Sequence, residues 1–279
     1  ATAIASDLVT PDKRSSAIAM MFTGLTVATI TGVPLGTWIG QQFGWEASFF
    51  TIALIGLISL IVNIFTVPKD LNEYEQASML EQLTVFKNKS LMMIYLITAL
   101  GYGGTFVVYT YLTTLLTDVL NYSDDAVVFL LVIYGVMVAI GNTLGGKLTN
   151  NQPTKVLIGI FLVQALVLLL VGITVTHYIL GTVIILLMGL FAFMNVPGLQ
   201  LIVVLFAERK NKATTNFASS LNIASFNIGI TLGSVIGGFV LNHFGITMTP
   251  YFGFGMVIIA SAIMYIIHKK ETVVELKVS

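Results

Sequence analysis

The chain has 279 residues, of which 56% are hydrophobic and only 9% are charged, against about 25% charge in an average globular protein. This is too little polar material to cover a water-facing surface, so the composition argues against soluble domains and predicts a polytopic protein whose main partner is the lipid bilayer. The absence of cysteine excludes a disulfide framework and thiolate metal sites. A net charge of zero with three scattered histidines gives no indication of nucleic-acid binding.

Charged residues divide the chain into apolar stretches, and a helix needs about 20 residues to cross a membrane. Two gaps, Lys155 to Glu208 and Lys212 to Lys269, are twice that length, and polar or turn residues divide each near its middle. The predicted fold class is therefore an all-α polytopic membrane protein with eight complete transmembrane helices. We expect them at roughly residues 15–40, 47–67, 91–117, 126–147, 155–175, 178–205, 214–241 and 250–268.

The loop charges predict an orientation. If the eight spans alternate strictly, all 13 lysines and arginines fall on one side of the membrane. The opposite loops hold only the acids Glu46, Asp118, Asp124 and Asp125. The positive-inside rule makes the basic side cytoplasmic, so we expect a multi-pass protein of the cell membrane with a cytoplasmic C-terminus.

An internal repeat organises the chain. A glycine stripe occurs twice, displaced by 197 residues, and each copy is followed by Phe-Gly, at Phe43-Gly44 and at Phe244-Gly245. The two stripes are Gly32, Gly36 and Gly40, and Gly229, Gly233 and Gly237. Both copies run in the same direction across the membrane, which indicates parallel halves related by an axis along the membrane normal.

The repeat also predicts the domain organisation. The repeated helix is the fifth of six in a C-terminal bundle over 91–268, so its copy at 15–40 should be the fifth of an N-terminal bundle. Helices one to three and most of helix four would then lie in about 107 residues before Ala1. We expect 1–67 to hold the end of helix four with helices five and six, 68–90 a cytoplasmic connector, and 269–279 a cytoplasmic tail. Within the connector, 70–88 fits an interfacial amphipathic helix or a solvated linker.

Several local sequences are similar to the arabinose-type sugar efflux branch of the major facilitator superfamily, which also includes drug–proton antiporters. They are Pro11-Asp12-Lys13-Arg14-Ser15-Ser16-Ala17, then Gly24 with Gly32-Val33-Pro34-Leu35-Gly36-Thr37, then Phe43-Gly44-Trp45, Phe106-Val107-Val108-Tyr109-Thr110-Tyr111-Leu112 and Gly141-Asn142-Thr143-Leu144-Gly145-Gly146-Lys147-Leu148. The resemblance covers the chain in order and implies an N-terminally truncated member of a twelve-helix family.

The resemblance implies a secondary active transporter that exports small organic solutes, sugars or drugs, by alternating access and proton antiport. Proton coupling usually needs an ionisable group at membrane depth, and the predicted spans contain no acid and have basic residues only at their ends, so we expect the coupling group in the preceding helices. Two alternatives stay open. The chain is a non-transporting fragment or partner subunit that assembles with a separate first bundle, or it belongs to a uniporter or importer of the same fold.

Polar residues inside the predicted spans are the candidates for the substrate path, because an unpaired polar group is costly in the membrane. They are Tyr102, Thr105, Tyr109, Asn195, Gln200, Asn222, Ser225 and Asn227. Each of them also fits plain interhelical hydrogen bonding.

The glycine stripes allow close helix packing, and the resemblance adds a role as seal or hinge between the transport states. Pro34 and Pro197 are expected to kink their helices. Enzyme chemistry is not expected: Gly141–Lys147 resembles a phosphate loop, but Leu148 replaces the required Ser or Thr and a membrane helix replaces the preceding strand. We therefore expect neither a cofactor nor a metal.

Overall fold

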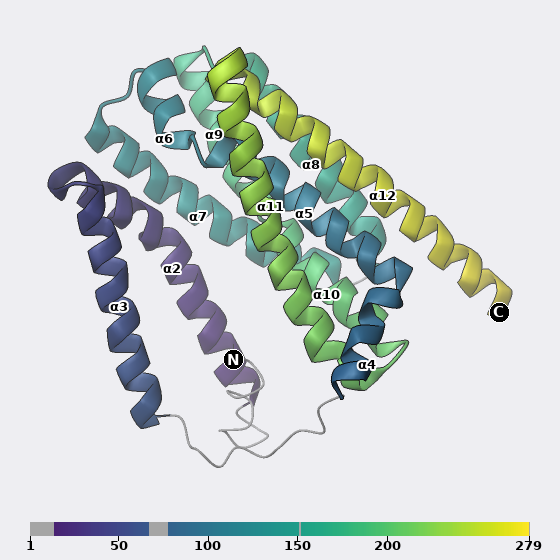
Figure 1. Ribbon diagram of the computed structural model, residues 1–279. Coiled ribbons are helices and arrows are strands. Elements are labelled where there is room, and N and C mark those ends of the chain that lie inside the picture. The colour runs from purple at the N-terminus through teal and green to yellow at the C-terminus, as the bar shows by residue number, and fades with distance from the viewer. Residues whose placement is uncertain (1–13, 67–77, 151, 279) are drawn as a thin grey trace. The chain divides into compact units, whose positions relative to one another are not determined.

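The computed structural model describes residues 14–66, 78–150 and 152–278 (Figure 1). All regular secondary structure in these ranges is helical, which confirms the predicted fold class. The chain divides into two compact units. The first contains Ala1–Tyr74 with Ser123–Val136, and the second contains Glu75–Tyr122 with Met137–Ser279.

The helices follow one another along the chain with short connections. They are α2 (Arg14–Phe43), α3 (Trp45–Thr66), α4 (Met79–Leu83), η2 (Thr84–Lys87), α5 (Lys89–Tyr109), α6 (Leu112–Thr114), the π-helix η3 (Leu115–Val119), α7 (Asp124–Thr149), α8 (Pro153–Thr174), α9 (Tyr178–Ala192), α10 (Asn195–Glu208), η4 (Lys212–Thr214), α11 (Thr215–Phe244), η5 (Ile246–Met248) and α12 (Thr249–Val278).

Seven helical stretches within the described ranges are long and apolar enough to cross a membrane. They start with α3 and end with α12, and α9 and α10 together form one of them, Tyr178–Glu208. These seven stretches coincide with the predicted spans from 47–67 onward. The remaining predicted span, 15–40, lies inside α2.

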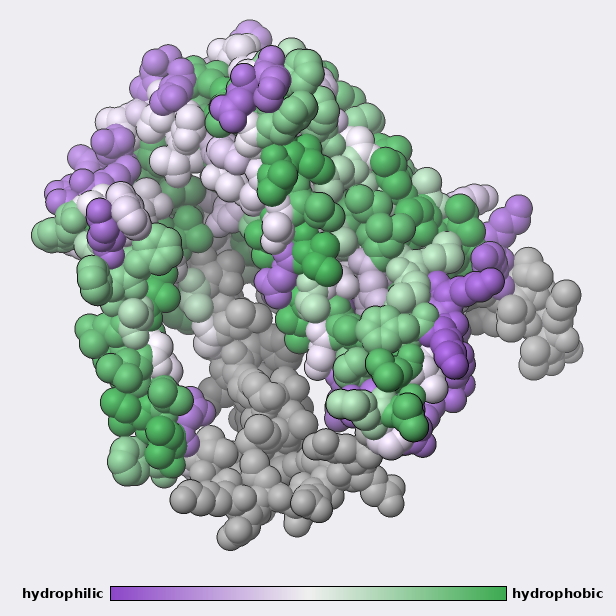
Figure 2. All heavy atoms as spheres, in the orientation of Figure 1, coloured by the Kyte–Doolittle hydropathy of each residue, from purple (hydrophilic) through white to green (hydrophobic). Residues whose placement is uncertain are grey.

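The first unit contains α2 and α3, which pack against each other. They turn at Gly44, whose φ of 88° is readily adopted only by glycine. The Ser48 hydroxyl donates a hydrogen bond to the Gly36 carbonyl at 2.8 Å and ties the two helices together. Within this structure α3 has no buried residue, and Figure 2 shows its surface covered by apolar side chains.

The two copies of the repeat have the same local structure. Both α2 and α11 are 30 residues long, and both end on the phenylalanine of a Phe-Gly pair. The glycine that follows has a φ of 88° at Gly44 and 89° at Gly245. The likeness that the glycine spacing predicted thus extends to the length of each helix and to the turn that ends it.

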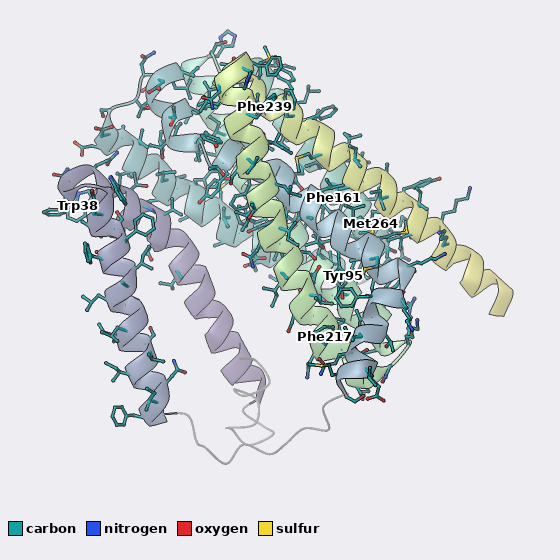
Figure 3. The ribbon with its side chains drawn as sticks, viewed as in Figure 1. Trp38, Tyr95, Phe161, Phe217, Phe239 and Met264 are labelled. Atoms are coloured by element: carbon teal, nitrogen blue, oxygen red, sulfur yellow. The ribbon has the colours of Figure 1, made fainter. Side chains whose placement is uncertain are left out.

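In the second unit, α5 packs against α10, α11 and α12, and α8 packs against α9, α10 and α12 (Figure 1). Asn88 caps the start of α5, its side-chain oxygen accepting from the backbone N–H of Ser90. Phe161 on α8 lies directly against Gly101 on α5, where a Cβ would collide with the ring. Tyr95 donates to the Ala218 carbonyl at 3.0 Å and joins α5 to α11; both aromatic residues are labelled in Figure 3.

Two predicted spans are interrupted. The span predicted at 91–117 ends its α-helix at Tyr109, because Tyr111 turns its ring over Gly237 and donates to the Ser234 carbonyl at 2.8 Å. The span predicted at 178–205 breaks between α9 and α10. Pro197 has no N–H to donate to Phe193, and its ring would clash with that carbonyl in a continuous helix. Pro34 lies inside α2, which continues through it, and a kink there stays a prediction.

The connector and the tail are described in part. Residues 70–77 of the predicted amphipathic segment and residues 1–13, where the end of helix four was expected, lie outside the described residues. Residues 78–87 form α4 and η2, and a capping box between Ser78 and Glu81 opens α4. At the other end, α12 continues through the predicted tail to Val278.

Candidate functional site

Five aromatic side chains of the second unit form a cluster, here called the ring cluster. Tyr102, Phe106 and Tyr109 lie on α5, Phe193 lies at the break between α9 and α10, and Phe226 lies on α11. Phe193 is in ring contact with all three α5 members, and its centroid is 5.4 Å from Tyr102 and 6.2 Å from Tyr109. Phe226 packs edge-on against Tyr102 at 4.9 Å. All five are half-buried.

A buried amide network lies beside the ring cluster and joins three helices. Gln164 of α8 is 1% exposed and donates to the Gly101 carbonyl and to the Thr105 hydroxyl of α5, both at 2.8 Å. Asn195, the first residue of α10, donates to the Gln164 side-chain oxygen at 2.8 Å and to the Ala192 carbonyl at 3.1 Å. We call Gln164, Asn195 and Thr105 the Gln164 network. It ties the helix break to α5.

Glycines of α7 let this helix approach the break closely. A Cβ at Gly141 would collide with the Leu190 carbonyl oxygen, and one at Gly145 would collide with that of Met194. Only a hydrogen fits at either position, so the helix break is held from α7 by backbone packing and from α8 by the Gln164 network.

A second polar network joins α5, α10 and α11. Asn222 accepts from the Thr98 hydroxyl at 2.8 Å and donates to the Gln200 side-chain oxygen at 2.8 Å. Gln200 in turn donates to the Ser219 hydroxyl. We call Thr98, Gln200, Ser219 and Asn222 the Asn222 network. The side-chain oxygens of Asn222 and Gln200 each accept a hydrogen bond from another member of the network.

The structure thus sorts the eight predicted path residues into different environments. Tyr102 and Tyr109 belong to the ring cluster, Thr105 and Asn195 to the Gln164 network, and Gln200 and Asn222 to the Asn222 network. Ser225 is buried and bonds back to the Leu221 carbonyl of its own helix. Asn227 is exposed and bonds only to the Ile223 carbonyl one turn before it.

The second glycine stripe lies against α5. A Cβ at Gly229 would lie 2.6 Å from the Ala99 carbonyl oxygen, and one at Gly237 would lie 2.5 Å from that of Val107. Gly233 meets the Gly103 carbonyl in the same way. The first stripe differs: among the described residues, a Cβ at Gly32 or Gly36 would meet nothing within 4 Å, and one at Gly40 would meet only Ser48.

The prediction missed one amide and three aromatic residues of the site: Gln164, Phe106, Phe193 and Phe226. Gln164 had a usable signal, because it is the one amide within the predicted span 155–175 and lies near the middle of that span. The three phenylalanines had none, since phenylalanine is a common apolar residue of the predicted spans. The site has no charged member, and the described part of the chain offers no group of three or more His, Asp or Glu side chains that could hold a metal ion.

A two-unit helical architecture with seven candidate spans in the described ranges defines a polytopic membrane protein. A profile of the Major Facilitator Superfamily matches residues 1–218. The chain belongs to this family.

Two bacterial relatives are similar over most of this chain. The uncharacterized MFS-type transporter YtbD of Bacillus subtilis is 48% identical over 261 residues, which cover 94% of this chain and 66% of the relative. The inner membrane transport protein YdhP of Escherichia coli is 33% identical over 251 residues, covering 90% of this chain and 63% of the relative. The chain therefore spans slightly less than two thirds of each relative's length.

Solved structures share the fold. A bacterial homolog to the human lysosomal transporter Spinster, in an inward-facing and unoccupied conformation, aligns with a TM-score of 0.70 over 96% of this chain and 73% of its own, at 14% identity. The E. coli fucose:proton symporter FucP aligns with a TM-score of 0.61 over 94% of this chain and 71% of its own, at 15% identity. At such low identities the likeness concerns the fold alone.

Proposed function

We propose that this chain forms the larger part of a secondary transporter that moves small organic solutes across the cell membrane by alternating access. One observation carries the proposal: aromatic rings and buried amides meet at a helix break inside an apolar bundle. Polar groups at membrane depth are costly and usually functional. The family and the transporter descriptions of YtbD and YdhP support the same activity.

We propose further that the solutes are sugars or drugs, that they are exported, and that proton antiport drives the export. The resemblance to the sugar efflux and drug antiporter branch supports this direction. The acids Glu46, Asp118, Asp124, Asp125 and Glu208 lie at helix ends or in short connections, and Glu271 and Glu275 lie in the part of α12 that follows its apolar stretch. The coupling acid therefore belongs, in this proposal, to a first bundle whose remaining helices complete residues 1–67. Residues 68–90 connect that bundle to 91–268, and 269–279 form the tail.

Proteoliposomes test the activity. The complete protein, with its first bundle, should take up ethidium or arabinose when a pH gradient is imposed, and nigericin, which dissipates the gradient, should abolish uptake. Residues 1–279 reconstituted alone should give no flux, because the solute path would lack half of its wall. Flux from residues 1–279 alone would contradict the divided path.

The same assay separates the alternatives. Uptake that persists after nigericin would replace antiport by uniport. A complete protein that moves neither solute in either direction would favour the partner-subunit reading, in which this chain supports another protein rather than transporting by itself.

A further inference from the structure

The side-chain oxygen of Asn195 has no hydrogen-bond partner, although the residue is 0% exposed. Buried polar groups are nearly always paired, and each exception in a native structure needs an explanation. The nitrogen of the same amide makes two hydrogen bonds, to Gln164 and to the Ala192 carbonyl. The side-chain nitrogen of Asn195 thus uses both of its N–H groups, whereas the side-chain oxygen accepts no hydrogen bond within the protein.

Gln164 determines which half remains available. Its own nitrogen donates to the Gly101 carbonyl and the Thr105 hydroxyl, so its oxygen must face Asn195 as an acceptor. The Ala192 carbonyl is a second acceptor at the same amide group. If the side-chain amide of Asn195 were rotated by half a turn, its oxygen would face both of these acceptors, and both hydrogen bonds that its nitrogen donates would be lost. Asn195 therefore keeps its nitrogen toward the network and its oxygen away from it.

The neighbourhood of this oxygen indicates what it accepts. Asn195 follows Phe193 by two residues. Gln164 forms hydrogen bonds with Gly101 and Thr105 of α5, and these two residues precede and follow Tyr102 in the sequence. Phe193 and Tyr102 are both members of the ring cluster, and their centroids are 5.4 Å apart. The acceptor and the uncharged aromatic surface thus belong to the same two helical segments.

Resting on the proposed function, we propose that Asn195 accepts a hydrogen bond from the transported solute and that Gln164 is the residue that positions it. The solute class is then a compound with a flat or apolar body, which packs on the ring cluster, and a hydroxyl or amino donor, which Asn195 receives. The Asn222 network offers no comparable acceptor, since both of its amide oxygens already have donors.

Equilibrium binding to the complete, detergent-purified protein tests the proposal with three probes. Arabinose carries hydroxyl donors, ethidium carries amino donors, and tetraphenylphosphonium carries aromatic rings without any donor. Asn195→Leu should weaken the binding of ethidium and arabinose about tenfold, which corresponds to about 1.4 kcal/mol, and should leave tetraphenylphosphonium binding unchanged. Gln164→Leu should also weaken the binding of ethidium relative to that of tetraphenylphosphonium, as Asn195→Leu does.

The ratio distinguishes positioning from structural damage, since a disturbed fold would weaken both probes together. Asn63→Leu is the matched control, because the Asn63 amide is exposed and bonds only to the Ser59 carbonyl of its own helix, and it should change the binding of none of the three probes. If Asn195→Leu does not fold, Asn195→Ala replaces it. Unchanged ethidium and arabinose binding in the folded Asn195 variant, or an equal loss for all three probes, overturns the proposal.

Failure of the proposed function gives a different result. If the complete protein binds ethidium through Asn195 but moves no solute into proteoliposomes, the result supports Asn195 as an acceptor and contradicts the proposed transport function. If wild type and Asn195→Leu transport ethidium with the same KM, the result supports the transport function and contradicts the proposal that Asn195 accepts a hydrogen bond from the solute.

Discussion

Single polar side chains inside the helices differ in what their hydrogen bonds accomplish. Asn222 is fully buried, and it bridges α5 and α10 from its place on α11. Asn227 lies on the same helix five residues later but is exposed and satisfies itself within α11. The sequence shows both as asparagines in an apolar helix. Only the packing of the helices shows that Asn222 links α11 to its neighbours, whereas Asn227 has no hydrogen bond to another helix.

This difference predicts unequal effects on stability. Asn222→Leu leaves the Thr98 hydroxyl without its acceptor and the Gln200 side-chain oxygen without its donor, and we expect it to destabilise the protein by about 1–2 kcal/mol. Asn227→Leu should stay within about 0.5 kcal/mol of wild type. Thermal unfolding of the two purified variants in the same detergent measures both values. Equal melting temperatures would show that the Asn222 network contributes nothing to stability.

At the scale of elements, glycine decides which helices approach most closely. Gly229, Gly233 and Gly237 lie against carbonyl oxygens of α5, and the glycines of α7 lie against the break between α9 and α10. Close approach of this kind is how helices associate where lipid supplies no hydrophobic driving force between them. The stripe was evident in the sequence, but its partner helix was not, because spacing alone does not say which neighbour a face meets.

Gly229→Ala should therefore destabilise the second unit, whereas Gly159→Ala should not. The added methyl group at Gly229 would lie 2.6 Å from the Ala99 carbonyl oxygen and force α5 and α11 apart, whereas Gly159 on α8 has nothing within 4 Å. Both substitutions replace helical glycine by alanine and gain the same helix propensity, about 1 kcal/mol. The difference in their unfolding midpoints reports the steric cost, expected at about 1–3 kcal/mol. A Gly229→Ala protein as stable as Gly159→Ala would contradict this packing.

For the whole molecule, the spacing of charges predicted much of the architecture and the order of the spans, because lipid tolerates few charges and fixes the length of each crossing. The break at Tyr111 was not predicted, because it involves a hydroxyl that reaches α11. At Phe193 the sequence predicted a kink from Pro197 but not the end of a helix. The candidate site was predicted as a set of polar residues. Its division into separate networks, and the place of Gln164 in one of them, follows from packing between helices that lie far apart in the sequence.

The loop charges predict the orientation of the whole molecule in the membrane. All 13 lysines and arginines fall on one side if the spans alternate, and the positive-inside rule makes that side cytoplasmic. Because the chain has no cysteine, single cysteines introduced at exposed connections between helices report accessibility without background from this chain. In intact cells, a membrane-impermeant maleimide should label His177→Cys, between α8 and α9, and should label Lys210→Cys, between α10 and η4, only after permeabilisation. The reverse pattern would invert the orientation, and labelling of both sites in intact cells would contradict the alternation of spans itself.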